Sequence, residues 1–157
     1  MKPIPHDHPA LALDAYQIEA KGEFAVAEAL SRPFCPGCSG SGQARSEVDG
    51  VITVGRCRCQ MLPDRIHLFN QAYIPARYAT ATFVSFQQFP GGKVKSLSAD
   101  AYRALGDCCT FVDGFRPAEV NRGMVLHGDV GRGKTHLLIG VLREIIFRHG
   151  VPVRFIE

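Results

Sequence analysis

The first stretch in which apolar residues recur at helical spacing lies between residues 10 and 30. These positions can share one broad helical face, although Gly22 lowers the helix propensity in its middle. The pattern therefore predicts a helical segment within residues 1–31. Its apolar face consists of Leu13, Ile18, Phe24, Ala27 and Leu30.

A longer helix is predicted to begin at Ser98, a residue type suited to the N-cap, with Asp100 in the first turn. Gly114 and Pro117 are expected to end it. Spacings of four and three give it a single apolar stripe. Of the two adjacent cysteines in this helix, Cys108 is expected in the core and Cys109 is expected to be inert. The stripe consists of Ala101, Leu105, Cys108, Val112 and Phe115.

Residues 32–63 differ from these stretches in being rich in Cys, Gly and Arg. Short β-type runs on either side of Asp49-Gly50 predict a hairpin, because this dipeptide favours a two-residue turn. A short helix starting at Asp64 is predicted to follow, over residues 64–71. The apolar positions are Val51, Ile52 and Val54 in the returning strand, and Ile66, Leu68 and Phe69 in the short helix.

The last part of the chain alternates strand, helix and strand. A β-type run at residues 124–127 leads into a glycine-rich loop, a helix follows over about residues 134–149, and Gly150 suits its C-cap before a second β-type run at 151–156. This order predicts an α/β fold with a parallel sheet. The chain then divides into a helical segment (1–31), a cysteine-rich module (32–63), a loop-rich connector (64–97) and the strand–helix–strand part with its preceding helix (98–157).

The composition is that of an ordinary globular protein: of the 157 residues, 46% are hydrophobic and 21% are charged. No apolar run approaches the roughly 18 residues that cross a bilayer. The N-terminus carries prolines and charged residues where a secretory signal has a continuous apolar core. We therefore expect a cytoplasmic protein without a membrane partner. A net charge of +3 permits a nucleic-acid partner without requiring one.

The glycine-rich loop reads GDVGRGKT and fits the phosphate-binding pattern G-x-x-x-x-G-K-[ST]. Glycines allow a tight turn in which successive N–H groups converge on an anion, and the following helix directs its N-terminus to the same place. Lys134 would reach the β- and γ-phosphates of ATP, and Thr135 would offer its hydroxyl to Mg²⁺. The alternative is a chance glycine-rich turn between a strand and a helix. The predicted nucleotide-binding residues are Gly128, Asp129, Val130, Gly131, Arg132, Gly133, Lys134, Thr135 and His136.

Six cysteines in a reducing compartment favour metal binding or packing over disulfides. Cys35 and Cys38 form one close pair, Cys57 and Cys59 form another, and the predicted hairpin would bring the pairs together. Four thiolates can hold one tetrahedral Zn²⁺, whose ligation would carry much of the folding free energy of so small a module. A redox pair in CPGC and unliganded thiols are the alternatives.

Four arginines lie in and around the cysteine-rich module. They could bind DNA phosphates or an acidic patch on a protein. A solvated basic face without a partner explains them equally well. They are Arg45, Arg56, Arg58 and Arg65.

Taken together, residues 73–157 resemble the DnaC/IstB group of AAA+ ATPases, which contains bacterial helicase loaders and transposition helper ATPases. The resemblance covers just over half of the chain. It is carried by IPARYATATFVSF, by a helix ending in CCTFVDGF, and by GDVGRGKTHL, in which His136 and Leu137 continue the phosphate loop. Cysteine-rich segments also precede the ATPase core in relatives of this group.

The resemblance implies that residues 128–135 bind ATP and Mg²⁺, and that the helix starting at Ser98 packs on the nucleotide side of the core. Members of the group also carry an acidic motif for Mg²⁺ and water on a later strand, then a sensor residue and arginines that act across subunits. None of these can be assigned here, and Asp113 is rejected because it lies upstream, inside a predicted helix. Other strands separate the first two in such sheets, so we expect a core truncated at Glu157, with direct pairing of the two strands as the alternative.

We therefore expect an ATP-binding protein of the helicase-loader or transposition-helper type. Its protein partner would be a replicative helicase or a transposase, and an oligomer would form only in the intact parent. Hydrolysis by this chain alone should be negligible, because groups that position water for phosphoryl transfer are missing. The alternative is a zinc-stabilised protein-interaction module with a vestigial nucleotide site. Single-stranded DNA binding by the arginine-bearing hairpin is a weaker alternative, because an aromatic stacking platform is lacking there.

Overall fold

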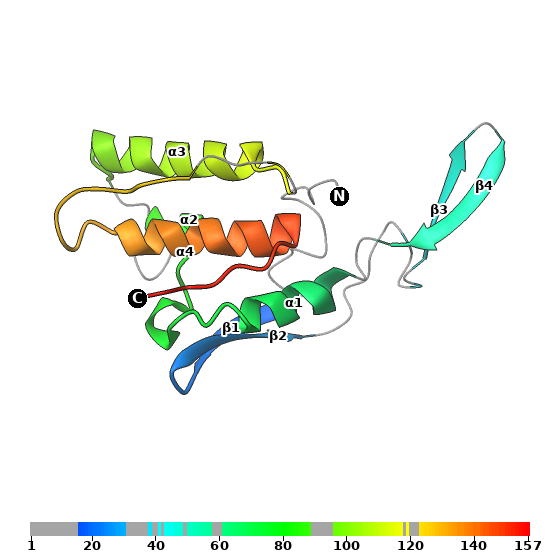
Figure 1. Cartoon of the computed structure of the whole chain (residues 1–157), viewed down its shortest axis with the longest axis horizontal. Helices are drawn as coiled ribbons and strands as arrows, with labels where there is room; N and C mark the ends of the chain where they lie inside the picture. Colours follow the sequence, from blue (N-terminus) through cyan, green and yellow to red (C-terminus); the bar gives the residue numbers. More distant parts are fainter. Residues whose placement is uncertain are drawn as a thin grey trace.

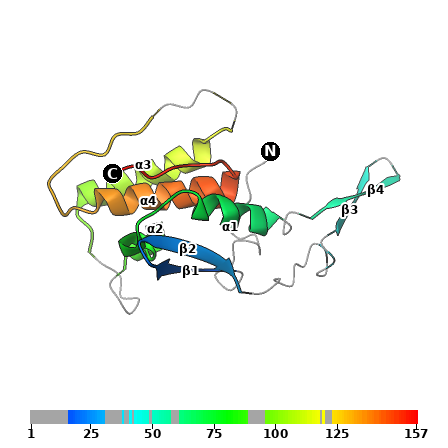
Figure 2. The same ribbon diagram turned by 60° about the horizontal axis from the view of Figure 1, so that its bottom comes forward.

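The computed structural model describes residues 16–30, 38, 41, 43–48, 50–57, 61–88, 96–117, 119 and 123–157. Within these residues the chain forms a mixed α/β fold with two small antiparallel sheets of two strands each (Figure 1). The first sheet packs against the short helix α1 (Leu62–Asn70), whereas the second extends away from the helices in both views (Figure 2). The helices α3 (Ala99–Gly114) and α4 (Lys134–Glu144) lie side by side.

The predicted N-terminal helix is wrong over the described residues. Here β1 (Tyr16–Lys21) and β2 (Phe24–Ala29) form an antiparallel hairpin. Gly22 lies in its turn with a φ of +60°, a conformation that glycine adopts without steric cost. Successive residues of a strand point to opposite faces, so the positions grouped by the helical pattern are divided between the two faces, Phe24 on one and Ala27 on the other.

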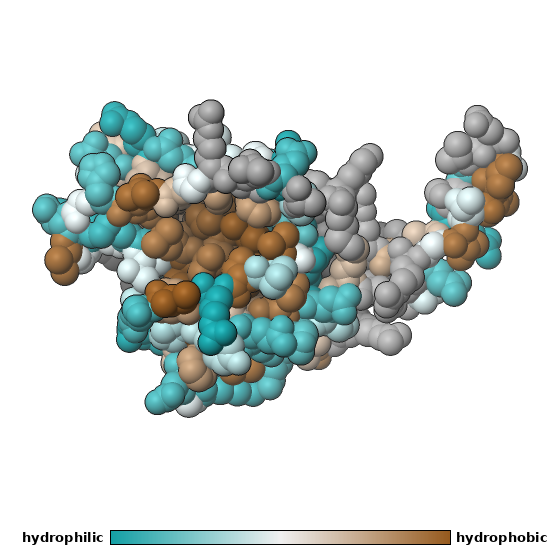
Figure 3. All heavy atoms as spheres, in the orientation of Figure 1, coloured by the Kyte–Doolittle hydropathy of each residue, from teal (hydrophilic) through white to brown (hydrophobic). Residues whose placement is uncertain are grey.

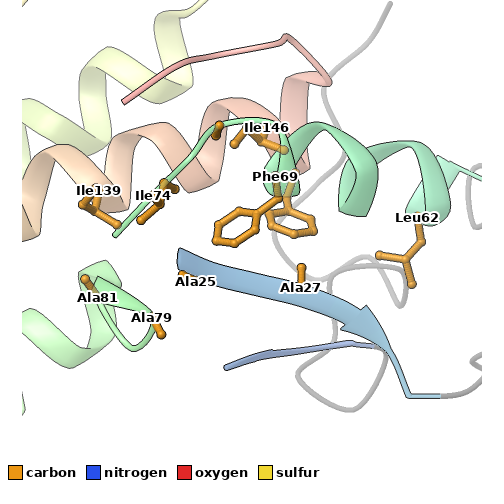
Figure 4. Packing of buried hydrophobic residues seen from close by; sticks show 11 residues of the cluster. Ala25, Ala27, Leu62, Phe69, Ile74, Ala79, Ala81, Ile139 and Ile146 are labelled. Atoms are coloured by element: carbon orange, nitrogen blue, oxygen red, sulfur yellow. The ribbon is translucent and has the colours of Figure 1, made fainter. Parts of the chain in front are cut away.

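The strand β2 is held by residues that come much later in the chain. The N–H of Ala25 donates to the carbonyl of Ile74 at 2.8 Å. The side-chain amide of Asn70 bonds twice to the backbone of Ala27, accepting at 2.8 Å and donating at 3.1 Å. Figure 4 shows Ala25 and Ala27 on β2 below Phe69 of α1, whose side chain is buried with them in one cluster and is 1% exposed. Small side chains here let α1 approach the strand closely.

The hairpin of β3 (Gln43–Val48) and β4 (Val51–Arg56) confirms the hairpin predicted within the cysteine-rich module. Its register leaves a two-residue turn, in which Gly50 has a φ of +75°. The apolar residues of the returning strand are largely exposed, so a two-stranded sheet of this kind gains little from burial. The exposed fractions are 63% for Val51, 65% for Ile52 and 57% for Val54.

The helix α3 was predicted correctly. The Ser98 side chain accepts a hydrogen bond from the N–H of Ala101 at 3.2 Å and so caps the helix. Leu105, Cys108 and Val112 are buried against α4, as the apolar stripe predicted. Burial raises the pKa of the Cys108 thiol to about 11, which makes it a poor nucleophile and fits the expected core position.

The helix α4 continues into a π-helical turn, η4 (Ile145–His149), and stops at Gly150. A φ of +67° at this glycine confirms the predicted C-cap. The short helix expected near residues 64–71 corresponds to α1. Within the described part of the chain, no helix combines the length and the apolar character needed to cross a bilayer.

The predicted parallel sheet is not found among the described residues. Residues 124–127 and 151–156 belong to neither sheet, and they do not pair with each other. Both pack on the hydrophobic cluster between α3 and α4, through Met124 and Val151 among others, and the N–H of Phe155 donates to the carbonyl of Ala72 at 2.9 Å. Apolar residues gather at the centre of the face on which these segments lie (Figure 3).

Candidate functional site

The phosphate-loop candidate, residues 128–135, is a turn leading directly into α4. Three glycines hold left-handed backbone conformations, with φ values of +137° at Gly128, +79° at Gly131 and +86° at Gly133. Gly133 is also the N-cap of α4. Residues with side chains rarely adopt these angles, so the loop depends on its glycines. The turn places backbone N–H groups at the positive end of the helix dipole, where an anion is favoured.

Lys134 folds back over this loop. Its Nζ donates to the carbonyl of Gly128 at 2.8 Å and to that of Asp129 at 2.7 Å. An ammonium group has three donors, so these two bonds leave capacity for a further acceptor. The ammonium group of Lys134 therefore lies next to the turn for which the sequence predicts phosphate binding.

Other side chains of the loop face solvent. Val130 is 99% exposed, and the guanidinium of Arg132 pairs with the carboxylate of Asp129 at 3.7 Å on the surface. A pair so exposed contributes little to stability. These three predicted residues can therefore contribute to anion binding mainly through their backbone.

Thr135, the predicted Mg²⁺ ligand, lies in the first turn of α4 beside a tyrosine from η3 (Ala76–Tyr78). Hydrogen bonding from Arg77 lowers the pKa of the Tyr78 hydroxyl, and Thr135 acts in the same direction, while burial opposes them. The guanidinium of Arg77 also lies 4.9 Å from the centre of the Tyr78 ring and pairs with Glu157. Sequence reasoning used Arg77 and Tyr78 only as a family signature and missed their position at the site.

His136 is directed away from the loop. Its Nε2 lies 2.9 Å from the hydroxyl of Ser85 and 2.9 Å from the carbonyl of Thr82. Both partners belong to the start of the short helix α2 (Phe83–Phe86). The structure thus joins His136 to the connector, whereas the sequence predicted a contact with nucleotide.

Asp113 lies far from the loop, which agrees with its rejection as a catalytic carboxylate. It pairs with Arg148 at 2.7 Å, at the far end of α4 and η4. Lys134 and Arg148 are separated by 14 positions, or roughly 20 Å at the rise of a helix.

The cysteine-rich module is described only in part, because Cys35 and Cys59 lie outside the described residues. Cys38 and Cys57 are 8% and 5% exposed and lie in one cluster with Ala44, at the base of the β3–β4 hairpin. The hairpin therefore brings one thiol from each predicted pair together, as a shared metal would require. The described residues contain no group of three or more possible metal ligands.

The arginines do not form one basic face. Arg65 is 4% exposed and packs against Gly150, and burial lowers its pKa. It is thus a core residue, and its predicted role in DNA binding is corrected. Arg45 is exposed on β3, and Arg58 lies outside the described residues.

Comparison with protein-family models, curated proteins and solved structures gave no match to this chain.

Proposed function

We propose that this chain binds ATP through residues 128–135. The observation that carries the proposal is the position of Lys134, whose ammonium lies across the carbonyls of Gly128 and Asp129 at the N-terminus of α4. A cation, the N–H groups of the turn and the helix dipole then favour negative charge at the same point. This combination suits a phosphate chain better than a neutral ligand.

Mg²⁺ would accompany the nucleotide. The hydroxyl of Thr135 is a hard oxygen ligand of the type that this ion takes, and one or two protein oxygens suffice because waters and phosphates complete its coordination. The ion would offset phosphate charge. The residues of the chain would bind and orient the phosphates.

The biological role that we propose is that of a helicase loader or transposition helper. It is supported by the resemblance of residues 73–157 to the DnaC/IstB group. A replicative helicase or a transposase–DNA complex would be the partner.

Titration of the full chain with a fluorescent ATP analogue and Mg²⁺ tests the site. Lys134→Ala should weaken binding by at least about tenfold, because a charge-assisted contact to phosphate is lost. Arg132→Ala is the matched control: it removes a cation from the same loop, but one that is exposed and paired only weakly with Asp129. Equal affinities for Lys134→Ala and the parent would refute the ATP site.

A second candidate function is a zinc-stabilised protein-interaction module. It is favoured by the burial of Cys38 and Cys57 in one cluster and by the exposed apolar residues of β4. On this proposal, Cys35 and Cys59 complete the ligand set and the nucleotide site is vestigial. Loss of a protein partner on Cys57→Ser, with nucleotide making no difference, would distinguish it from the first.

A further inference from the structure

The short helix α2 packs against a glycine face of α4. A Cβ atom on Gly133 would lie 2.7 Å from Cε2 of Phe86, and one on Gly140 would lie 2.6 Å from the ring of Phe83. The two glycines are seven positions apart, which is close to two helical turns, so they share one side of α4. Each phenyl ring therefore occupies the space that a side chain on its glycine would fill. Of the two glycines, only Gly133, which Phe86 contacts, belongs to residues 128–135.

The position of α2 is fixed by hydrogen bonds. Thr82 and Ser85 form a capping box, in which each side chain bonds to the backbone N–H of the other at 2.9 Å. His136 adds a link from α4 to both residues. The carbonyl of Thr82 can only accept, so a hydrogen bond to it requires the tautomer of His136 in which Nε2 carries the hydrogen. A four-residue helix is unstable alone, so these bonds and the two rings account for its place.

We propose that α2 holds the phosphate loop in its binding conformation, with Phe86 and His136 as positioning residues. This inference rests on the proposed ATP site. Glycine has a wide range of accessible backbone angles, and a loop rich in glycine must lose that freedom when it closes on an anion. The ring of Phe86 restricts Gly133, and His136 ties the first turn of α4 to α2. Part of the ordering of the loop is thus complete before the nucleotide binds, and this raises the affinity for ATP.

A matched pair of variants tests the proposal. Phe86→Leu and Phe83→Leu each remove one phenyl ring from α2. The ring of Phe86 lies against Gly133 and that of Phe83 lies against Gly140. We expect Phe86→Leu to weaken binding of the ATP analogue by about fivefold or more, and Phe83→Leu by less than about twofold, at similar losses of stability. Phe86→Met, which refills much of the space, should restore most of the affinity. Equal losses of affinity in the two leucine variants would overturn the proposal.

Hydrogen exchange gives a readout that needs no nucleotide. The amides of residues 131–134 should exchange faster in Phe86→Leu than in the parent and stay at the parental rate in Phe83→Leu. Ser85→Ala, which removes a partner of His136, should give a milder version of the same change, with the exposed Val84→Ala as its control. Unchanged exchange in both Phe86→Leu and Ser85→Ala would refute the positioning role of α2, whether or not the chain binds ATP. An unchanged affinity in Lys134→Ala would count only against the ATP site.

Discussion

Arg65 and Gly150 are packed so closely that a Cβ atom on the glycine would coincide with the guanidinium of the arginine. Arg65 comes from α1 and Gly150 ends the helix formed by α4 and η4, so this contact joins two residues more than 80 positions apart. The glycine also has a φ of +67°. Two independent requirements, backbone conformation and space, therefore select glycine at this position.

Gly150→Ala should accordingly be destabilising. The left-handed conformation alone costs a residue with a Cβ about 1–2 kcal/mol, and displacement of the buried guanidinium adds to it. Chemical denaturation of the full chain measures the change. Gly106→Ala is the control, because this glycine is exposed in α3 and a Cβ added to it would have no neighbour within 4 Å. That variant should gain stability from its higher helix propensity, by up to about 1 kcal/mol.

The features that the sequence predicted correctly are those with local causes. The Ser98 cap, the turn at Gly50 and the left-handed backbone of Gly150 each involve residues within four positions of one another, although the space at Gly150 is also limited by Arg65. The turn at residues 128–133 is equally local, because the positive φ values of Gly128, Gly131 and Gly133 are adopted mainly by glycine. Such signals can be read without knowing the rest of the fold.

The N-terminal hairpin was missed because its causes are distant. Ala25 and Ala27 have high helix propensity, and nothing near them in sequence opposes a helix except Gly22. Their strand conformation is instead selected by Ile74 and Asn70, which bond to their backbone from more than 40 positions away. The contacts of His136 were missed for the same reason, since its partners lie more than 50 positions upstream.

The second prediction concerns zinc binding by the cysteine-rich module. The purified chain should contain about one zinc ion, and Cys57→Ser should abolish it, because three thiolates with an open position hold the ion less well. The β3–β4 hairpin, with its exposed apolar residues, should then lose its protection from proteolysis, since metal ligation would supply much of its stability. Metal analysis and limited proteolysis measure the two effects.

The control for the zinc prediction is Cys109→Ser, which removes a half-buried thiol from α3. Its zinc content should equal that of the parent. Burial raises the pKa of the Cys109 thiol, which further argues against a thiolate there. A chain that is fully folded and free of zinc after purification with added metal would contradict the predicted site.

Acid should weaken the fold through His149. Burial lowers the pKa of this imidazole below its usual value of 6.5, and the positive charges of Arg148, Arg116 and Arg65 act in the same direction, while a hydrogen bond to the Val112 carbonyl opposes them. The unfolded chain therefore binds a proton more readily than the folded one. Stability is complete above about pH 6.5 and falls as the pH drops through the lowered pKa.

Unfolding free energies measured between pH 7.5 and pH 5 test this behaviour. His149→Asn should be less stable than the parent at neutral pH but should show a shallower decline with acid, because the titrating group is gone. The control is His127→Asn, which replaces an exposed histidine. An unchanged slope in His149→Asn would show that other groups govern the acid response.

The last prediction is that this chain binds ATP without turning it over. Phosphoryl transfer needs groups that orient water and hold the metal, and Asp129 and Asp113 are poor candidates for both tasks. Asp129 lies in the loop, where its carboxylate faces Arg132, and Asp113 pairs with Arg148 at the other end of α4. Phosphate release by the parent chain should therefore equal that of Lys134→Ala. Steady release that disappears in Lys134→Ala would contradict this prediction and would mean that the chain holds a catalytic group that the sequence does not reveal.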